Sequence, residues 1–288
     1  MPHGHGAHVS GQYAEEISRN TERTSLLASV RALATTPVKG MRLQSRQAVR
    51  LDPHGVAENR RFFLVDARDR MLNGKQLGAL SAVIASYDQA QDSLTMAFPD
   101  REEVAGTIEL AGEIRARFFS RELPASLVVG PWGDALTAYA GHELRLVMAA
   151  NDGTAVDRGL AGAVSLIGRA SVEKLEQLAA REVDVRRFRM LVEVEGIEAH
   201  AEDSWVGCSL RIGDAIVRFR GHVGRCLVTG QNPDSGVPDM PTLDLLRSYR
   251  HGGDTTEPLA FGIYGEVLTP GLVRIGDEVR EVGPQTRD

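Results

Sequence analysis

The stretch from His222 to Arg250 reads HVGRCLVTGQNPDSGVPDMPTLDLLRSYR. A segment rich in Val, Arg and Phe, Ala215–Arg220, leads into it, and its composition predicts a β-strand. Asn, Pro, Asp, Ser and Gly at 232–236 predict a turn, and Leu and Tyr at helical spacing over 241–250 predict a helix. The sequence therefore places Cys226 where a strand gives way to a loop.

Cys226 allows two interpretations on the residues alone. Arg225 beside it would favour a thiolate, as a reactive or metal-binding cysteine requires. A free cysteine also behaves as a small buried hydrophobic residue. A lone cysteine with no neighbouring His or second Cys is more often of this second kind. Both interpretations remain open at this point.

Length and composition limit the class of protein. The chain has 288 residues, 42% hydrophobic and 25% charged, which suits one large domain or two closely packed ones. A net charge of −6 argues against general binding to nucleic acid or to anionic membranes. The sequence contains no long apolar run and no apolar N-terminal signal segment, so we expect a cytoplasmic protein that does not span a membrane.

The cysteine content limits the redox chemistry. Cys208 and Cys226 are too few for a disulfide scaffold. Their number also excludes an iron–sulfur cluster held by this chain, because such a cluster needs about four Cys or His ligands.

Hydrophobic patterns predict mostly strands. Residues 1–24 are polar and poorly periodic, and we expect a disordered tail there. Strands spaced roughly ten residues apart are typical of a barrel or sandwich. In the first half they are expected at Leu26–Thr35, Gln47–Leu51, Phe62–Val65, Ser93–Phe98, Ile114–Phe119 and Leu144–Met148. A polar, glycine-rich segment at 152–162 is the candidate boundary. A helix over Val172–Ala180, capped by Ser171, is expected after it.

Several motifs resemble one family. RCLVTGQNPDSG (225–236) and TLDLLRSYR (242–250) resemble the Arg-Cys-x-x-Thr-Thr-x-Asp-Pro-x-Thr-Gly stretch and the following Leu-x-x-Leu-x-x-Tyr-Arg helix of the MOSC family. That family comprises molybdenum cofactor sulfurase C-terminal domains and mitochondrial amidoxime-reducing components. In this chain Gly230 replaces the second Thr, and Gln231-Asn232 replace the x-Asp pair.

The resemblance extends to the first half and to the last strands. The matching segments are Pro37-Val38-Lys39-Gly40, Arg61–Val65, Asn73–Gln76, Phe188-Arg189, Ala201–Trp205 and Phe261–Gly265. It implies an α+β, mainly β fold: a MOSC-type β-barrel with a few helices at 151–288, packed on an N-terminal β-barrel-like domain at 25–150. The family shows Phe-Arg-Pro-Asn where this chain has Met190 and Leu191 after Phe188-Arg189.

Site residues are implied by the same resemblance. Cys226 takes the position of the molybdenum ligand and of the catalytic residue. Cationic side chains suit the terminal phosphate of a pterin, because arginine binds it bidentately. The positions that match the cofactor-binding residues are Lys39, Arg61, Arg189, Arg225, Ser171 and Tyr264. Ser171 is included because a helix N-terminus offers backbone N–H groups to anions. Ala201–Trp205 makes either a structural turn or a catalytic carboxylate at Glu202 or Asp203.

The resemblance implies a molybdenum–molybdopterin (Mo-MPT) oxidoreductase. Such a centre cycles between Mo(VI) and Mo(IV) and reduces N-hydroxylated compounds or small N- and S-oxides by oxygen-atom transfer. We therefore expect a small-molecule substrate and a separate ferredoxin- or cytochrome-like electron-transfer protein. The family is also associated with pyridoxal phosphate binding. Two other functions stay open: sulfur transfer through a persulfide on Cys226, and a non-catalytic module that binds or carries the molybdenum cofactor.

Overall fold

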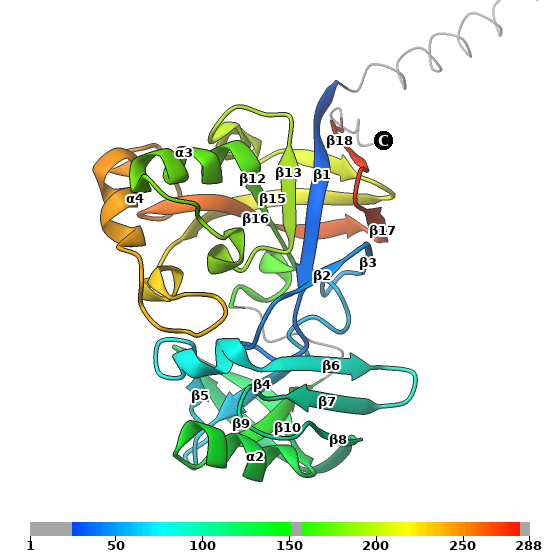
Figure 1. The fold of residues 1–288 in the computed structure, drawn as a ribbon. Coiled ribbons are helices and arrows are strands. Elements are labelled where there is room, and N and C mark those ends of the chain that lie inside the picture. Colours follow the sequence, from blue (N-terminus) through cyan, green and yellow to red (C-terminus); the bar gives the residue numbers. More distant parts are fainter. Residues whose placement is uncertain (1–24, 151–156, 283–288) are drawn as a thin grey trace, which may run out of the picture.

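The computed structural model describes residues 25–150 and 157–282, so the tail expected at 1–24 lies outside the described residues. Figure 1 shows a β-barrel, with helices packed against one side, above a second group of strands. None of the helices in the described ranges has the length and apolar composition needed to cross a membrane.

The upper part is a closed barrel. Its sheet runs in the order β13-β12-β16-β15-β14-β18-β1-β2, and β13 also pairs with β1, which closes a ring of seven strands within the described chain. The strands are β1 (Leu26–Thr35), β2 (Gln44–Arg46), β12 (Val164–Gly168), β13 (Val192–Glu195), β14 (Ser209–Ile212), β15 (Ala215–Gly224), β16 (Ala260–Thr269) and β18 (Glu278–Glu281). Their alternating apolar residues, such as Val30, Val217 and Phe219, fill the barrel core.

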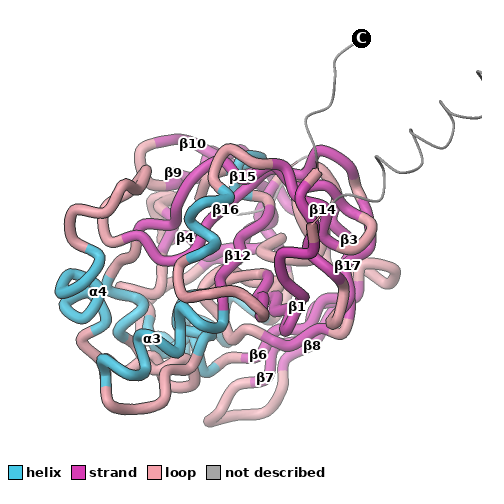
Figure 2. Tube along the Cα trace, turned by 90° about the horizontal axis from the view of Figure 1, so that it is seen from above, coloured by secondary structure: helices cyan, strands magenta, loops and turns pink. Residues whose placement is uncertain are grey.

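Two helices lie side by side on the barrel. They are α3 (Arg169–Ala179) and α4 (Thr242–Arg250), and Figure 2 shows them together at one edge of the molecule. α3 buries Val172 and Leu175, which are three residues apart on one helical face. They join Leu246 of α4 in a second hydrophobic cluster. A two-stranded sheet of β3 (Ala48–Leu51) and β17 (Gly271–Arg274) also accompanies the barrel.

The N-terminal half contains a five-stranded and a three-stranded sheet. The first joins β5 (Met71–Leu72), β4 (Phe62–Val65), β11 (Arg145–Ala149), β10 (Arg121–Val129) and β9 (Glu109–Phe118); the second joins β6 (Ile84–Asp88), β7 (Ser93–Ala97) and β8 (Val104–Thr107). Trp132, at the start of α2 (Trp132–Ala140), is fully buried between them and donates its indole N–H to the Leu94 carbonyl at 3.2 Å.

Short 3-10 helices occupy the connections. They are η1 (Gly78–Ala82), η2 (Gly159–Gly162), η3 (Val185–Phe188), η4 (Ala201–Trp205) and η5 (Leu227–Gly230). The expected fold class, α+β and mainly β with a barrel, is confirmed. The division of the chain at residue 150 stays a proposal, and the strands cross it: β1 and β2 precede that point but pair in the barrel sheet.

The two halves meet at a contact between glycines. Gly236 has φ +72°, and a Cβ on it would overlap the carbonyl group of Gly78. Beside this contact, Gln231 donates from Nε2 to the Gly74 carbonyl at 2.8 Å, and Arg42 donates from Nη2 to the Asp234 carbonyl at 3.0 Å. Residues 231–236 can therefore approach the N-terminal half only because position 236 lacks a side chain.

This contact predicts that alanine destabilises the fold more at Gly236 than at Gly252. Gly236 and Gly252 both have positive φ, so alanine at either position incurs a similar backbone penalty, about 1–2 kcal/mol. A Cβ on Gly252 would meet nothing within 4 Å. We expect Gly236→Ala to lower the free energy of unfolding by about 1–3 kcal/mol more than Gly252→Ala, because backbone atoms must separate. Urea unfolding measures the free energy of unfolding of both variants. Equal losses in the two variants would contradict a tight backbone contact at Gly236.

Candidate functional site

A pocket of about 360 Å³ lies where the barrel meets the N-terminal half. Its lining combines Lys39, Arg60 and Gly74 from the N-terminal half with Arg189 and Cys226 from the second half. A concave site of this size can enclose most of a small ligand. The pocket exists only in the folded chain, because residues from both halves build it.

Cys226 lies at the pocket, directly between β15 and η5. Its backbone is extended, and its carbonyl oxygen accepts from the N–H and the hydroxyl of Thr229, at 3.1 and 2.9 Å. The residue is exposed and lines the pocket. The interpretation of Cys226 as a buried hydrophobic residue is therefore wrong, and its thiol is open to a ligand.

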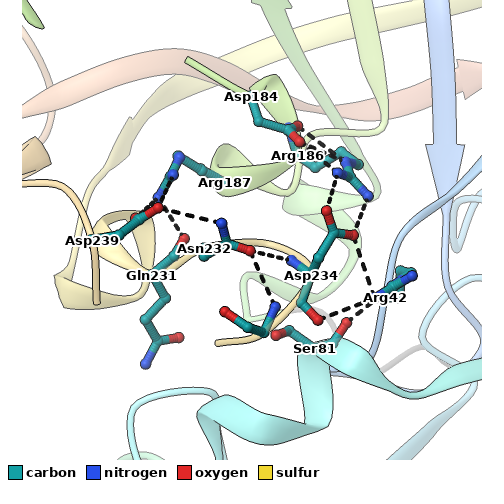
Figure 3. Close-up of polar contacts among 10 residues, drawn as sticks. Arg42, Ser81, Asp184, Arg186, Arg187, Gln231, Asn232, Asp234 and Asp239 are labelled. Carbon is teal, nitrogen blue, oxygen red and sulfur yellow. Dashed lines mark hydrogen bonds and ion pairs between the residues drawn. The ribbon is translucent and has the colours of Figure 1, made fainter. Parts of the chain in front are cut away.

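The loop that follows Cys226 is held by two arginine–aspartate pairs (Figure 3). The guanidinium of Arg187, which is 5% exposed, binds both carboxylate oxygens of Asp239, at 2.6 and 2.8 Å. Arg186 does the same to Asp234, at 2.9 Å for both contacts. Such paired bonds fix direction as well as distance. η3, which carries both arginines, therefore holds the loop after Cys226 in place.

Turn chemistry within the loop completes this support. The Asn232 side-chain oxygen accepts from the N–H groups of Asp234 and Ser235, at 2.9 and 3.1 Å. A Cβ at Gly230 would lie 2.7 Å from the Met240 carbonyl oxygen, so the backbone leaves no room for the threonine of the family pattern. The departures from that pattern at 230–232 are thus accommodated by local packing.

Three cations gather on another wall of the pocket. Lys39 donates from Nζ to Asp157 at 2.7 Å, Arg60 to the Arg189 carbonyl at 2.9 Å, and Arg189 to the Met41 carbonyl at 2.7 Å. Desolvation lowers the pKa of Lys39 from 10.5 to about 8, although Asp157 opposes the change. Desolvation also lowers the pKa of Arg189, and the charge of Arg60 lowers it further. The wall is therefore short of negative charge.

Arg225 belongs to the same pocket but is held by the main chain. Its guanidinium donates to the carbonyls of Phe261 and Phe188, at 2.8 and 2.9 Å, and lies over the Phe188 ring. Desolvation lowers its pKa, while the neighbouring Cys226 raises it. Arg225 therefore holds a guanidinium in a fixed position beside Cys226.

The structure brings five of the predicted site residues together on the pocket: Lys39, Arg189, Arg225, Cys226 and Tyr264. Arg61 does not line it in the described structure; its Nη1 donates to the Ala149 carbonyl at 3.1 Å. Arg60, one residue earlier, lines the pocket instead. Arg60 has φ +53°, a local turn that the sequence does not reveal.

Ser171 is also away from the described pocket lining, and its expected role as a cap is wrong. α3 begins at Arg169, so Ser171 lies inside its first turn, fully buried. The carboxylate of Glu202 accepts from the Ser171 hydroxyl at 2.7 Å and from the Gly168 N–H at 3.1 Å. Desolvation raises the pKa of Glu202, and these hydrogen bonds oppose it. Glu202 therefore stabilises the helix N-terminus.

Asp203 likewise has a structural partner. Its Oδ2 accepts from Arg250 of α4 at 2.7 Å. Neither Glu202 nor Asp203 lines the described part of the pocket. The structural interpretation of Ala201–Trp205 therefore fits better than a catalytic carboxylate.

Two pocket residues, Asp157 and Arg158, were missed by the sequence analysis. Arg158 forms an ion pair with Glu257 and lies 4.5 Å from the centroid of the Tyr264 ring. Tyr264 thus lines the pocket beneath a guanidinium. Both residues fall in the segment expected to be a connection, where no motif marked them.

The donor set suits an anionic ligand with a soft metal. The cations of the described lining are Lys39, Lys75, Arg60, Arg158, Arg186, Arg187, Arg189 and Arg225, whereas Asp157 is its only carboxylate. Arg158, Arg186 and Arg187 have carboxylate partners outside the lining. The remaining cations still outnumber Asp157 and fit a phosphate, and the exposed thiol of Cys226 fits a soft metal. Among the described residues, no group of three or more His, Cys, Asp or Glu side chains could hold a metal ion without further ligands.

The fold and the site define a two-part β-barrel protein with a cationic, thiol-bearing pocket at the junction of its parts. The chain belongs to the MOSC family. Residues 153–280 match the MOSC domain, and residues 27–129 match the MOSC N-terminal beta barrel domain.

Named relatives are similar in sequence. Mitochondrial amidoxime-reducing component 1 of Mus musculus is 33% identical over 124 residues, which cover 41% of this chain and 36% of the relative. The match thus spans about a third of that relative's length. The protein of the same name from Danio rerio is 24% identical over 294 residues, covering 92% of this chain and 88% of its own. The crystal structure of the YUAD protein from Bacillus subtilis aligns over 90% of this chain and 97% of its own with a TM-score of 0.42 and 12% identity.

Anion binding should depend on the proton of Lys39. Because its pKa is about 8, Lys39 carries a charge below that pH and loses it above. Sulfate affinity should therefore fall as the pH rises through about 8, since sulfate itself keeps its charge there. Lys39→Arg should flatten the fall, because arginine stays protonated. Calorimetric titration of cofactor-free protein between pH 7 and 9 measures this. The same decline in both proteins would exclude Lys39 as its cause.

Proposed function

We propose that the protein is a molybdenum-cofactor-dependent oxidoreductase that reduces N-hydroxylated or N- and S-oxide small molecules. The observation that carries the proposal is an exposed thiol, Cys226, in a pocket whose cations exceed its carboxylates. The relatives named as amidoxime-reducing components support the substrate class.

Each part of the pocket would hold one part of the cofactor. The sulfur of Cys226 would bind molybdenum, with the guanidinium of Arg225 beside it. Lys39, Arg60 and Arg189 would bind the pterin phosphate, because a single carboxylate, Asp157, faces these three cations. When bound, the cofactor supplies two-electron oxygen-atom transfer.

The protein's own contribution is orientation. The arginine–aspartate pairs at Asp234 and Asp239 restrict the loop after Cys226, so the sulfur would hold one position while the substrate changes. The two cysteines of the chain are too few for an iron–sulfur cluster. We infer that a ferredoxin- or cytochrome-like electron-transfer protein is the partner that supplies the electrons.

Sulfur transfer is the second candidate. Cys226 is exposed, and the side chain of Leu227 after it is among the exposed large hydrophobic residues, at 69%. A persulfide on Cys226 would be within reach of another protein. A third candidate, a module that only carries the molybdenum cofactor, needs the same pocket without turnover.

Replacing Cys226 tests the proposal. Protein made in a host that synthesises the molybdenum cofactor should contain molybdenum and pterin and should reduce an aromatic amidoxime with reduced methyl viologen as electron donor. Cys226→Ser should lower the turnover by roughly a hundredfold or more, because it removes the protein's metal ligand. Elemental analysis, pterin fluorescence and product formation are the measurements.

Cys208→Ser is the matched control, because Cys208 does not line the described pocket. It should retain metal and activity. A wild-type protein that reduces amidoximes without molybdenum would refute the proposal. A persulfide found by mass spectrometry on Cys226 after incubation with a cysteine desulfurase, in metal-free protein, would favour sulfur transfer instead. Tight cofactor binding with no turnover would favour the carrier.

A further inference from the structure

Asp157 is a single carboxylate in the described pocket lining, which is otherwise rich in cations. In the described lining it is the only carboxylate, and its Oδ1 lies 2.7 Å from Nζ of Lys39. Lys39 is well shielded, with 11% of its side chain exposed, whereas 41% of the Asp157 side chain is exposed. The carboxylate is thus the more accessible partner of the pair, while the lysine is shielded.

The electrostatics of the pair reach beyond Lys39. Desolvation would raise the pKa of Asp157, but the charges of Lys39, Arg60 and Arg158 hold it below its usual value. Asp157 also opposes the desolvation that lowers the pKa of Arg60 and Arg189. One carboxylate therefore partly compensates three crowded cations.

The backbone around Asp157 is held independently of its carboxylate. Arg121 donates from Nη2 to the Asp157 carbonyl at 2.9 Å. On the next residue, Arg158 is anchored by its ion pair with Glu257. The side chain of Asp157 can therefore rotate away from Lys39 while its own carbonyl and the side chain of Arg158 remain held.

We propose that Asp157 is an internal counter-ion, which occupies the subsite that the anionic group of a bound ligand takes and competes with that group for Lys39, Arg60 and Arg189. In the empty pocket the Asp157 carboxylate stabilises the cations. On binding, the ligand's anion replaces it, and the carboxylate turns toward solvent. The inference deepens the proposed function but needs only an anionic ligand, so it does not depend on the molybdenum chemistry.

Neutralising Asp157 should have two opposite effects. Asp157→Asn removes the competitor, so cofactor-free protein should bind sulfate roughly tenfold more tightly, as expected for a close charge pair in a shielded site. The same change leaves the cations uncompensated, so the melting temperature without sulfate should fall. Added sulfate should recover more of that loss in the variant than in the wild type.

The test is a sulfate titration by calorimetry at a pH well below the pKa of Lys39, so that Lys39 is protonated in both proteins. Melting curves are recorded in parallel, on cofactor-free wild-type and variant proteins. Asp69→Asn is the matched control: Asp69 pairs with Arg145 at 2.9 Å, outside the described pocket lining. It should leave the sulfate affinity unchanged. Unchanged or weaker sulfate binding by Asp157→Asn would overturn the proposal.

A second comparison remains valid if Asp157→Asn does not fold. Lys39→Met/Asp157→Asn removes both partners of the pair, and its reference is Lys39→Met. Because Arg60 and Arg189 remain, the double variant should still bind sulfate more tightly than Lys39→Met, and equal affinities would overturn the proposal. Either result is independent of metal content, so failure here and failure of the molybdenum proposal can be told apart.

Discussion

Positive charge crowded into a pocket is the constraint on which the site depends. Cations removed from water are costly unless a partner compensates them. In this protein Lys39, Arg60 and Arg189 converge where the two halves meet, and one exposed carboxylate, Asp157, faces them. The structure tolerates the imbalance because main-chain carbonyls accept from both arginines. A net positive charge remains, and an anionic ligand would neutralise it.

On the side of the pocket formed by η3, the arginines do have carboxylate partners. Arg186 and Arg187, consecutive on η3, each grip a carboxylate of the loop after Cys226 with two bonds. Both arginines have carboxylate partners within the protein, and these ion pairs fix the loop. The pocket therefore has an immobilised side that bears the thiol and an undercompensated side that attracts charge. Such a division suits a ligand with an anionic end and a metal end.

Membership of the MOSC family agrees with this arrangement, and the departures from its sequence pattern have local causes. Gly230 takes the place of a threonine where the Met240 carbonyl leaves no space for a side chain. Gln231, at the variable position of the pattern, reaches across to the carbonyl of Gly74 in the N-terminal half. The loop after Cys226 thus joins the two halves.

The sequence by itself determined several of the strands and the place of the thiol. β1 and β4 have the predicted bounds, because alternating or continuous apolar residues specify a buried strand locally. Cys226 follows a strand, as its neighbours predicted. The tertiary structure alone decided which cations reach the pocket: a positive φ at Arg60 brings that residue into the lining in place of Arg61. It also turned Ser171 toward Glu202 and brought Asp157 to Lys39, 118 positions away. Contacts of that separation depend on how sheets close and pack, which no local pattern encodes.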